Sequence, residues 1–131
     1  MMAGKAALFD DAATLARIMA VQPGEASFHR TPMQQRLLGR EVTPFADATW
    51  REAARAIVLR GNRARFAQNP DLRATLLATG TRTLVEGSAK DRLWGVGLAW
   101  NDPAIENPAN WKGTNWLGQV LMQVREALRP A

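Results

Sequence analysis

The 131-residue sequence contains no cysteine and a single histidine, His29. Without cysteine, the chain cannot form disulfides, thiol nucleophiles or thiolate metal sites, and one histidine cannot make a multi-histidine metal site. Catalysis would therefore have to use carboxylates, lysine or bound water. We expect no metal ion and no organic cofactor, and we interpret His29, which follows Phe28, as a loop residue rather than a catalyst.

Long apolar runs are also missing. No stretch approaches the roughly 20 residues that a membrane-spanning helix needs, and residues 1–5 lack the layout of a secretory signal. We therefore expect no membrane partner and predict a cytoplasmic protein. The composition, with 47% hydrophobic and 22% charged residues, is typical of a folded protein with a packed core, and the length suits one domain over residues 1–131.

Lysine is scarce among the basic residues. Only Lys5, Lys90 and Lys112 are lysines among 17 basic residues, so the formal net charge of +5 comes mainly from arginine. Arginine binds phosphate through a planar fork of donors, which favours a nucleotide or nucleic-acid ligand. A bias of genome composition explains the same arginine content equally well.

Helical periodicity dominates the chain, and the sequence predicts a mainly α fold. Five helices are expected, near residues 12–21, 31–38, 49–68, 70–79 and 115–128. Pro23-Gly24 would end the first. In the second, Leu37 and Leu38 are expected to face inward, and Thr49 would open the third as the first residue of a capping box that ends at Glu52.

Little of the sequence is typical of β-structure. The only plausible strand is Thr83-Leu84-Val85-Glu86, which is short, β-prone and bounded by turn residues. A long irregular segment with several glycines and prolines follows it, and such connections often carry function. The fold class expected is therefore mainly α, with minor short strands beside a long functional loop.

Several motifs follow one another along the chain. They are Met1-Met2-Ala3-Gly4-Lys5-Ala6, Leu38-Gly39-Arg40, Gly61-Asn62 through Phe66 to Leu84-Val85-Glu86, Asp91-Arg92-Leu93-Trp94-Gly95-Val96-Gly97, and Trp111-Lys112-Gly113-Thr114-Asn115-Trp116-Leu117-Gly118 through Arg125. Each motif is weak alone, but their order and spacing are specific and cover nearly the whole chain. Together they resemble the NADAR (YbiA-like) family of N-glycosidases. The resemblance implies a single-domain YbiA-like helical fold.

The same resemblance implies cleavage of the bond between ribose C1 and a base nitrogen. The family's substrates are phosphorylated ribosylamino-pyrimidine intermediates of riboflavin synthesis and ADP-ribose attached to guanine in nucleic acid. The expected partner is therefore a ribosyl-phosphate or ADP-ribosyl compound, including ADP-ribosylated nucleic acid. The family pattern also has a Glu-x-Tyr segment before the motif that starts this chain, so we describe the chain as N-terminally truncated relative to the family.

The catalytic residues that we predict are Lys5, Glu86 and Asp91. A ribosylamine can open to an imine, and the amine of Lys5 could exchange onto C1 as a Schiff base. Glu86 would act as an acid if partial burial raised its pKa, and Asp91 would orient the sugar or water. The structural alternatives are a solvated lysine in a frayed terminus, an exposed acid at a strand end, and a turn cap before Trp94.

Substrate binding is assigned to aromatic and backbone groups. Trp94 offers a flat surface for stacking, and Gly95 and Gly97 would let backbone approach a ligand closely. Trp50 is expected in the core with an edge in the site. Asn115 begins the last helix, whose free N–H groups would favour phosphate, although Asn115 could simply be an N-cap.

Two other functions remain compatible with the sequence. One is a catalytically impaired module that keeps an ADP-ribose or nucleotide pocket without turnover. The other is an arginine-rich nucleic-acid-binding domain that shares only ancestry with the family.

Overall fold

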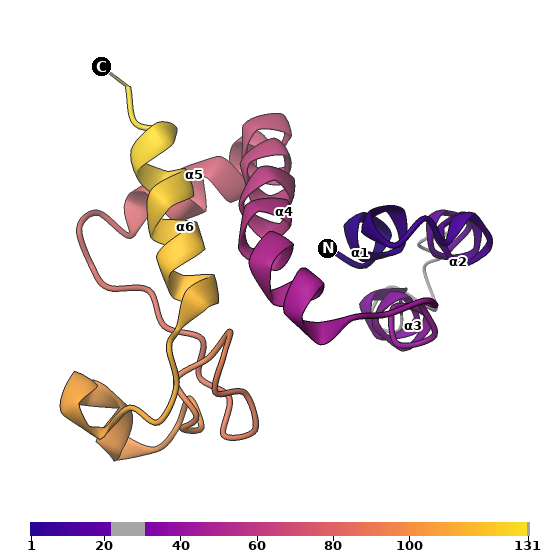
Figure 1. Cartoon of the computed structure of the whole chain (residues 1–131). Coiled ribbons are helices and arrows are strands. Elements are labelled where there is room, and N and C mark those ends of the chain that lie inside the picture. Colours follow the sequence, from indigo (N-terminus) through magenta and orange to yellow (C-terminus); the bar gives the residue numbers. More distant parts are fainter. Residues whose placement is uncertain (22–30, 131) are drawn as a thin grey trace. The chain divides into compact units, whose positions relative to one another are not determined.

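The computed structural model describes residues 1–21 and 31–130, and it divides them into two compact units, Met1–Ile57 and Val58–Ala131. In the described part the helices are α1 (Met2–Leu8), α2 (Ala12–Met19), α3 (Thr31–Leu38), α4 (Asp47–Gln68), α5 (Pro70–Ala78) and α6 (Trp116–Ala127), with 3₁₀ helices η1 (Pro103–Glu106) and η2 (Pro108–Asn110) (Figure 1). The mainly α prediction is confirmed. None of the helices in this part has the length and apolar character needed to cross a bilayer.

The first unit contains α1, α2 and α3. Helix α1 packs against α2, and α3 contacts both. Their core consists of Ala6, Ile18 and Val42, all of them buried, with partly buried Leu15 and Leu38 against it. The sequence did not predict α1, because residues 2–8 carry no capping signal and the first turn lacks an acidic residue. Pro23-Gly24 and His29 lie outside the described residues.

Asp11 ties the start of α2 to the segment after α3. Its Oδ1 accepts a hydrogen bond from the N–H of Thr14 at 2.9 Å, which caps the helix. Its Oδ2 accepts a second bond, also 2.9 Å, from the N–H of Thr43. These backbone donors lower the pKa of the Asp11 carboxyl, since they stabilise the charged form.

Two local predictions in this unit are wrong. Helix α4 begins at Asp47, two residues before the proposed capping box at Thr49, and Asp47 instead pairs with Arg51 at 2.7 Å one turn later. In α3 only Leu38 packs against the core, whereas Leu37 remains 51% exposed. Adjacent residues on a helix point about 100° apart, so one short helix cannot turn both leucines fully inward.

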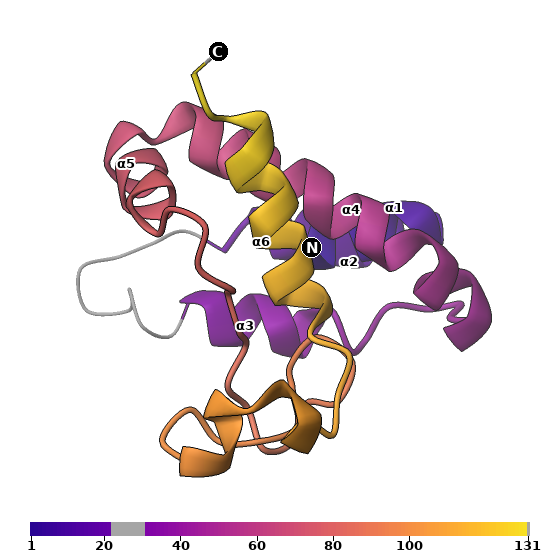
Figure 2. The same cartoon turned by 90° about the vertical axis from the view of Figure 1, so that its left-hand side faces the viewer.

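The second unit is built around buried residues from three helices. Val58 comes from α4, Leu76 from α5, and Val120 and Val124 from α6. Both views show α6 beside the C-terminal half of α4 and beside α5 (Figures 1 and 2). The leucine and valine spacing of the last helix therefore predicted its buried face correctly.

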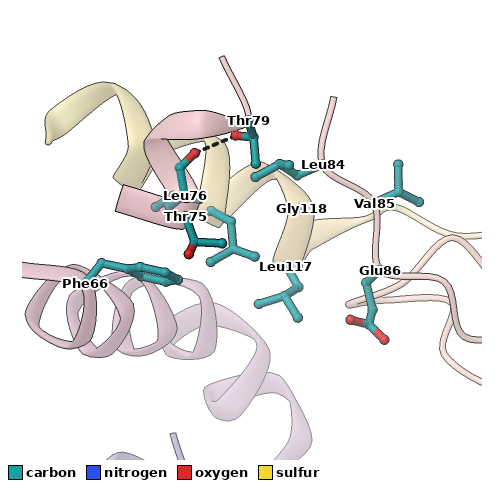
Figure 3. A pocket seen from close by; sticks show the side chains of 10 residues that line it. Phe66, Thr75, Leu76, Thr79, Leu84, Val85, Glu86, Leu117 and Gly118 are labelled. Atoms are coloured by element: carbon teal, nitrogen blue, oxygen red, sulfur yellow. Dashed lines mark hydrogen bonds between the residues drawn. The ribbon is translucent and has the colours of Figure 1, made fainter. Parts of the chain in front are cut away.

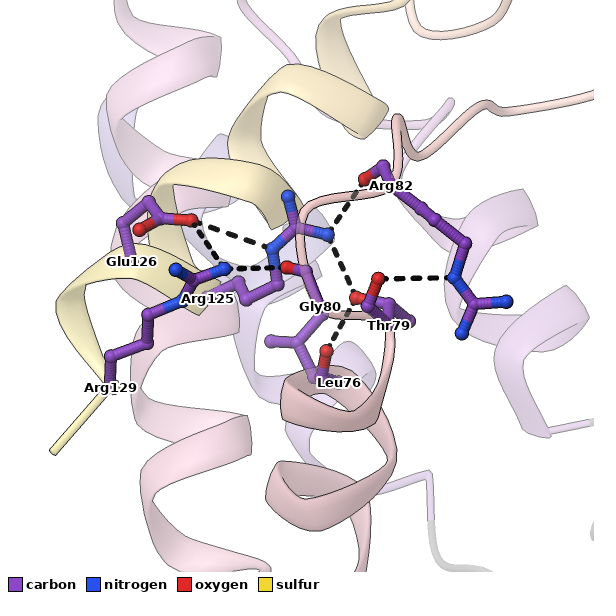
Figure 4. A network of polar contacts seen from close by, with 7 residues as sticks. All are labelled: Leu76, Thr79, Gly80, Arg82, Arg125, Glu126 and Arg129. Carbon is purple, nitrogen blue, oxygen red and sulfur yellow. Dashed lines mark hydrogen bonds and ion pairs between the residues drawn. The ribbon is translucent and has the colours of Figure 1, made fainter.

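A buried guanidinium joins α6 to the end of α5. Arg125 is only 3% exposed, and its Nη1 donates to the Thr79 hydroxyl and to the Arg82 carbonyl, both at 2.8 Å. Arg129 donates to the carbonyl of Gly80 and pairs with Glu126 at 3.2 Å (Figure 4). Cations near the last carbonyls of a helix are favourable, so this network stabilises the C-terminus of α5.

The strand expected at residues 83–86 is absent, and an asparagine side chain takes the place of a partner strand. Asn115 Nδ2 donates to the Leu84 carbonyl at 2.8 Å, and its Oδ1 accepts from the Glu86 N–H at 3.0 Å. The Glu86 carbonyl in turn accepts from the N–H of Val96 at 3.0 Å. The segment has extended β character but no neighbouring strand in the described residues, so the strand prediction is wrong for a tertiary reason.

Backbone conformation and close packing place this amide. Asn115 is 2% exposed and has left-handed dihedral angles, φ 52° and ψ 41°, which asparagine tolerates better than most residues. A Cβ at Gly118 would collide with the Leu84 carbonyl and with the Asn115 amide. Glycine at 118 therefore leaves the space in which the amide bridges the two segments.

Asn115→Ala should destabilise the chain strongly. It removes both bonds and leaves the Leu84 carbonyl and the Glu86 N–H without a partner, at about 1–3 kcal/mol for each group that stays buried. Urea unfolding would measure the loss. Asn115→Gly is the matched control, because it accepts the positive φ but also lacks the amide. Wild-type stability in the glycine variant would mean that the backbone angle, and not the two hydrogen bonds, is what residue 115 supplies.

Acid should weaken the first unit through Asp11. Because its folded-state pKa lies below the ordinary 3.8, its stabilisation is present above that value and is lost as the pH falls through the folded-state pKa. Asp11→Asn should therefore melt below wild type at neutral pH, and the difference should shrink in acid. Thermal melts of both proteins across the acidic range test this, and a difference that does not change with pH would contradict it.

Candidate functional site

Lys5 lies on α1, and its amine is close to two aromatic rings and a backbone carbonyl. Its Nζ donates a 2.7 Å hydrogen bond to the carbonyl of Gly39. The same nitrogen lies 4.1 Å from the ring centroid of Phe45 and 5.9 Å from that of Trp50. Lys5 is therefore an ordered, half-buried residue of a helix, and the alternative of a solvated lysine in a frayed terminus is wrong.

Burial changes the acid–base behaviour of this amine. Desolvation lowers the pKa of Lys5 from its ordinary value of 10.5, because the charged form is the one that loses water. None of the ion pairs within the described residues involves Lys5, so no carboxylate there counteracts this effect. A larger share of the amine is thus neutral near pH 7 than in a free lysine, and only the neutral amine is nucleophilic.

Two glycines of the sequence motifs bring the surroundings of Lys5 together. A Cβ at Gly39 would collide with the Met2 side chain, and a Cβ at Gly4 would lie only 2.5 Å from Cγ2 of Ile57. The absence of these side chains lets α1 approach both α4 and the end of α3. Close approach at Gly39 also brings its carbonyl to Lys5, so the Met-Met-Ala-Gly-Lys and Leu-Gly-Arg motifs act as one local structure.

Glu86 lies at a pocket in the second unit. The pocket has a volume of about 260 Å³ and is mostly apolar (Figure 3). Its wall comes from α4, α5, α6 and the extended segment, and it includes Phe66, Thr75, Leu76, Thr79, Leu84, Val85, Glu86, Leu117, Gly118 and Leu121. Glu86 is half-buried and supplies the carboxylate among these groups. A carboxylate beside an apolar pocket can exchange a proton with a bound base.

Asp91 forms a turn cap. Its Oδ1 accepts from the N–H of Trp94 at 2.8 Å and from the N–H of Leu93 at 3.1 Å. The backbone carbonyl of Asp91 accepts from the N–H of Gly97 at 3.0 Å. This geometry matches the turn-cap alternative, so Asp91 positions the loop, and a direct part in catalysis stays a prediction.

Gly95 and Gly97 allow close contact within the protein. A Cβ at Gly95 would lie 2.8 Å from the carbonyl oxygen of Glu86 and 2.9 Å from that of Asp91. Gly97 has a φ of +70°, which favours glycine, and a Cβ there would press on Lys112. Both glycines are buried, and the protein's own neighbouring groups explain why a side chain does not fit at either position. Close approach of a ligand to them stays a prediction.

The tryptophans differ in their surroundings. Trp94 is partly buried against the core of the second unit and meets Trp116 edge to face, with ring centroids 5.5 Å apart. This is the core alternative, and stacking of a base on Trp94 stays a prediction. Trp50 is half-buried, with its ring centroid 5.9 Å from the Lys5 nitrogen, and its part in a site stays a prediction. Trp100 is the most exposed, at 79%.

The start of α6 has fewer free donors than the phosphate hypothesis assumes. The N–H groups of Asn115, Trp116 and Leu117 donate to the carbonyls of Gly95, Leu93 and Trp94, at 3.0–3.1 Å. The Asn115 side chain makes no cap hydrogen bond to the helix either, because it bridges Leu84 and Glu86. The N-cap alternative is therefore wrong for the side chain, and these three N–H groups are not free to bind phosphate.

The described residues contain no group of three histidine, cysteine, aspartate or glutamate side chains that could hold a metal ion.

Sequence reasoning missed Phe45 and the Gly39 carbonyl, which surround the Lys5 amine. The only signal for Phe45 would have been its place just before α4, which also carries Trp50, the other ring near the Lys5 amine.

Comparison with known proteins extends the match to nearly the whole chain. The NADAR domain model matches residues 1–129. The chain is 42% identical over 127 residues to N-glycosidase R617 of Acanthamoeba polyphaga mimivirus, which covers 96% of this chain and 69% of that protein. It is 40% identical over 99 residues to protein irg-1 of Caenorhabditis elegans, covering 74% and 47%.

N-glycosidase YbiA of Escherichia coli (strain K12) is 34% identical over 98 residues, which cover 75% of this chain and 54% of that protein. The chain thus spans about half the length of the irg-1 and YbiA relatives. With a domain match from residue 1 to residue 129, the chain belongs to the NADAR family.

Proposed function

We propose that this chain is an N-glycosidase that cleaves the bond between ribose C1 and a base nitrogen, with Lys5 as the nucleophile. The observation that carries the proposal is the environment of the Lys5 amine, which is half-buried, held by the Gly39 carbonyl and lowered in pKa. The relatives R617 and YbiA are themselves named N-glycosidases, which supports the same reaction class.

The proposed reaction balances without a cofactor. Opening of the ribosylamine ring gives an imine at C1, and the neutral Lys5 amine adds to that carbon. The bond from C1 to the base nitrogen then breaks, the base leaves with the electron pair and a proton, and C1 becomes a protonated Schiff base with Nζ. Water hydrolyses this bond, which releases the sugar and restores the amine.

Glu86 is the proposed proton donor for the departing base. Its carboxyl belongs to a half-buried residue that lines an apolar pocket, so a base bound in that pocket would lie beside it. Asp91 is proposed as a positioning residue, since it caps the loop that carries Trp94. Trp50, Trp94, Gly95 and Gly97 are proposed to bind the substrate, and Asn115 to hold the segment that carries Glu86.

The proposed substrates are phosphorylated or ADP-ribosylated. The net charge of +5 favours a polyanionic compound, and phosphorylated ribosylamino-pyrimidines and ADP-ribosyl-guanine in nucleic acid both fit the reaction. Cleavage assays on each class, run side by side at low and high salt, would separate them, because a nucleic-acid substrate should lose affinity more steeply with salt.

Borohydride trapping tests Lys5 directly. Reduction during turnover should convert the Schiff base into a stable secondary amine, and mass spectrometry should place the sugar on the peptide that contains Lys5. Lys5→Ala and Lys5→Arg should both prevent trapping, since arginine keeps the charge but does not deprotonate. Lys90→Ala, which changes an exposed lysine, is the matched control and should trap as wild type does.

The outcomes of this assay separate the alternatives. Cleavage by wild type with no adduct would mean direct attack by water, with Lys5 only binding substrate. If the chain binds both substrate classes but cleaves neither, it is a binding module and the enzyme proposal is wrong.

Glu86→Gln should lower the cleavage rate by about 100-fold or more, because an amide keeps the shape but cannot transfer a proton. The melting temperature should hardly change, since none of the ion pairs within the described residues involves this carboxylate. Glu106→Gln, at an exposed carboxylate of η1, is the control. Wild-type turnover in Glu86→Gln would rule out the proton-donor role.

A further inference from the structure

The ring of Phe45 covers the nitrogen that the proposed mechanism uses. Its centroid is 4.1 Å from Lys5 Nζ, well within the distance of about 6 Å at which a cation is attracted to an aromatic face. Phe9 contacts Phe45 edge to face, with centroids 5.2 Å apart and planes at 61°. This second ring supports the first from the side, so Phe45 has a defined place although it is 46% exposed.

A phenylalanine half open to water is not explained by the core of the first unit. That core is formed by Ala6, Ile18 and Val42 with partly buried neighbours, and Phe45 is not among them. Phe45 contacts the ring of Phe9 and the Lys5 amine. These two contacts place its ring against the Lys5 nitrogen.

We propose that Phe45 stabilises the positive charge of the Schiff base formed on Lys5, so that it promotes formation of the covalent intermediate. The inference rests on the proposed function of Lys5. When the amine has added to C1 and the base has left, the positive charge is shared between Nζ and C1. The nitrogen stays at the end of the Lys5 side chain, so the face that now attracts the ammonium would attract the iminium as well.

The contact can raise the rate because it is stronger after the amine has attacked C1 than before. At a pH above the pKa of Lys5 the amine is already neutral and gains nothing from the quadrupole of the ring, whereas the cation that forms does. Below that pKa the ring also stabilises the resting ammonium, so the gain in rate belongs to the neutral amine. An interaction that is stronger in the charged state than in the reacting neutral amine lowers the barrier. The Gly39 carbonyl acts in the same direction, because it accepts a hydrogen bond from the nitrogen in its charged forms.

Fluorinated phenylalanines at position 45 provide the test. One, two or three fluorine atoms withdraw electrons from the ring face while changing its size little, so the cation–π attraction falls stepwise. At a pH above the Lys5 pKa, where the amine is neutral in every variant, the rate of borohydride-trapped adduct should fall in the same order, by about 2- to 30-fold for the trifluorinated ring. Phe45→Trp should retain or raise the rate, and Phe45→Leu should lower it.

The same fluorine series at Phe9 is the matched control. Phe9 touches the Phe45 ring but is not the ring over Nζ, so its series should be flat. A flat series at position 45, with Phe45→Leu alone impaired, would show that Phe45 supplies only volume and would overturn the inference.

A second readout does not depend on turnover. The pKa of the Lys5 amine, followed by NMR on carbon-13-labelled lysine, should fall stepwise along the fluorine series at position 45, since the charged form loses its partner ring. An unchanged pKa would overturn the inference whatever the activity. If wild type shows no trapping while this pKa series holds, the proposed nucleophile fails and the contact between ring and cation stands.

Discussion

The second unit depends on the amide of Asn115. This one buried side chain makes two hydrogen bonds, to a carbonyl and an N–H of residues 84–86, which an adjacent strand would otherwise make. The left-handed backbone of Asn115 and the space above Gly118 are the conditions for this contact. Without the bridge, the segment that carries Glu86 would have lost its attachment to the start of α6.

The same region shows how a loop replaces regular structure. The first N–H groups of α6 donate to carbonyls of residues 93–95, and the Glu86 carbonyl receives the N–H of Val96. Backbone groups that a sheet would pair are thus paired between the loop, the extended segment and the helix start. Residues 84–86 and the first residues of α6, which these bonds hold together, form part of the wall of the pocket beside Glu86.

The sequence predicted the helices better than the contacts between them. The helices α2, α5 and α6 follow from local periodicity, and the structure contains them. Residues 83–86 have strand-like composition, but pairing is a tertiary property, and a side chain provides it here. Helix α1 was missed because its stability comes from packing of Ala6 rather than from a capping signal.

The candidate site residues also differ in how they were predicted from the sequence. Lys5, Glu86 and Asp91 came from the resemblance, and their catalytic roles stay predictions; Asp91 is engaged by backbone N–H groups. Trp50 came from an apolar helical stripe and Asn115 from its place at a helix start, and the Asn115 amide is likewise engaged by backbone groups. Phe45 could not be predicted, since its contact with Lys5 joins residues 40 positions apart and no local pattern encodes it.

The glycines around α1 limit which substitutions this sequence can accept. At Gly39 the space that a side chain would need is already filled by Met2, and at Gly4 it is filled by Ile57. Any larger residue at either glycine would require a smaller one at its partner, so each pair should change together or not at all. Positions 2 and 39, and positions 4 and 57, are therefore expected to covary among relatives that keep the lysine between them.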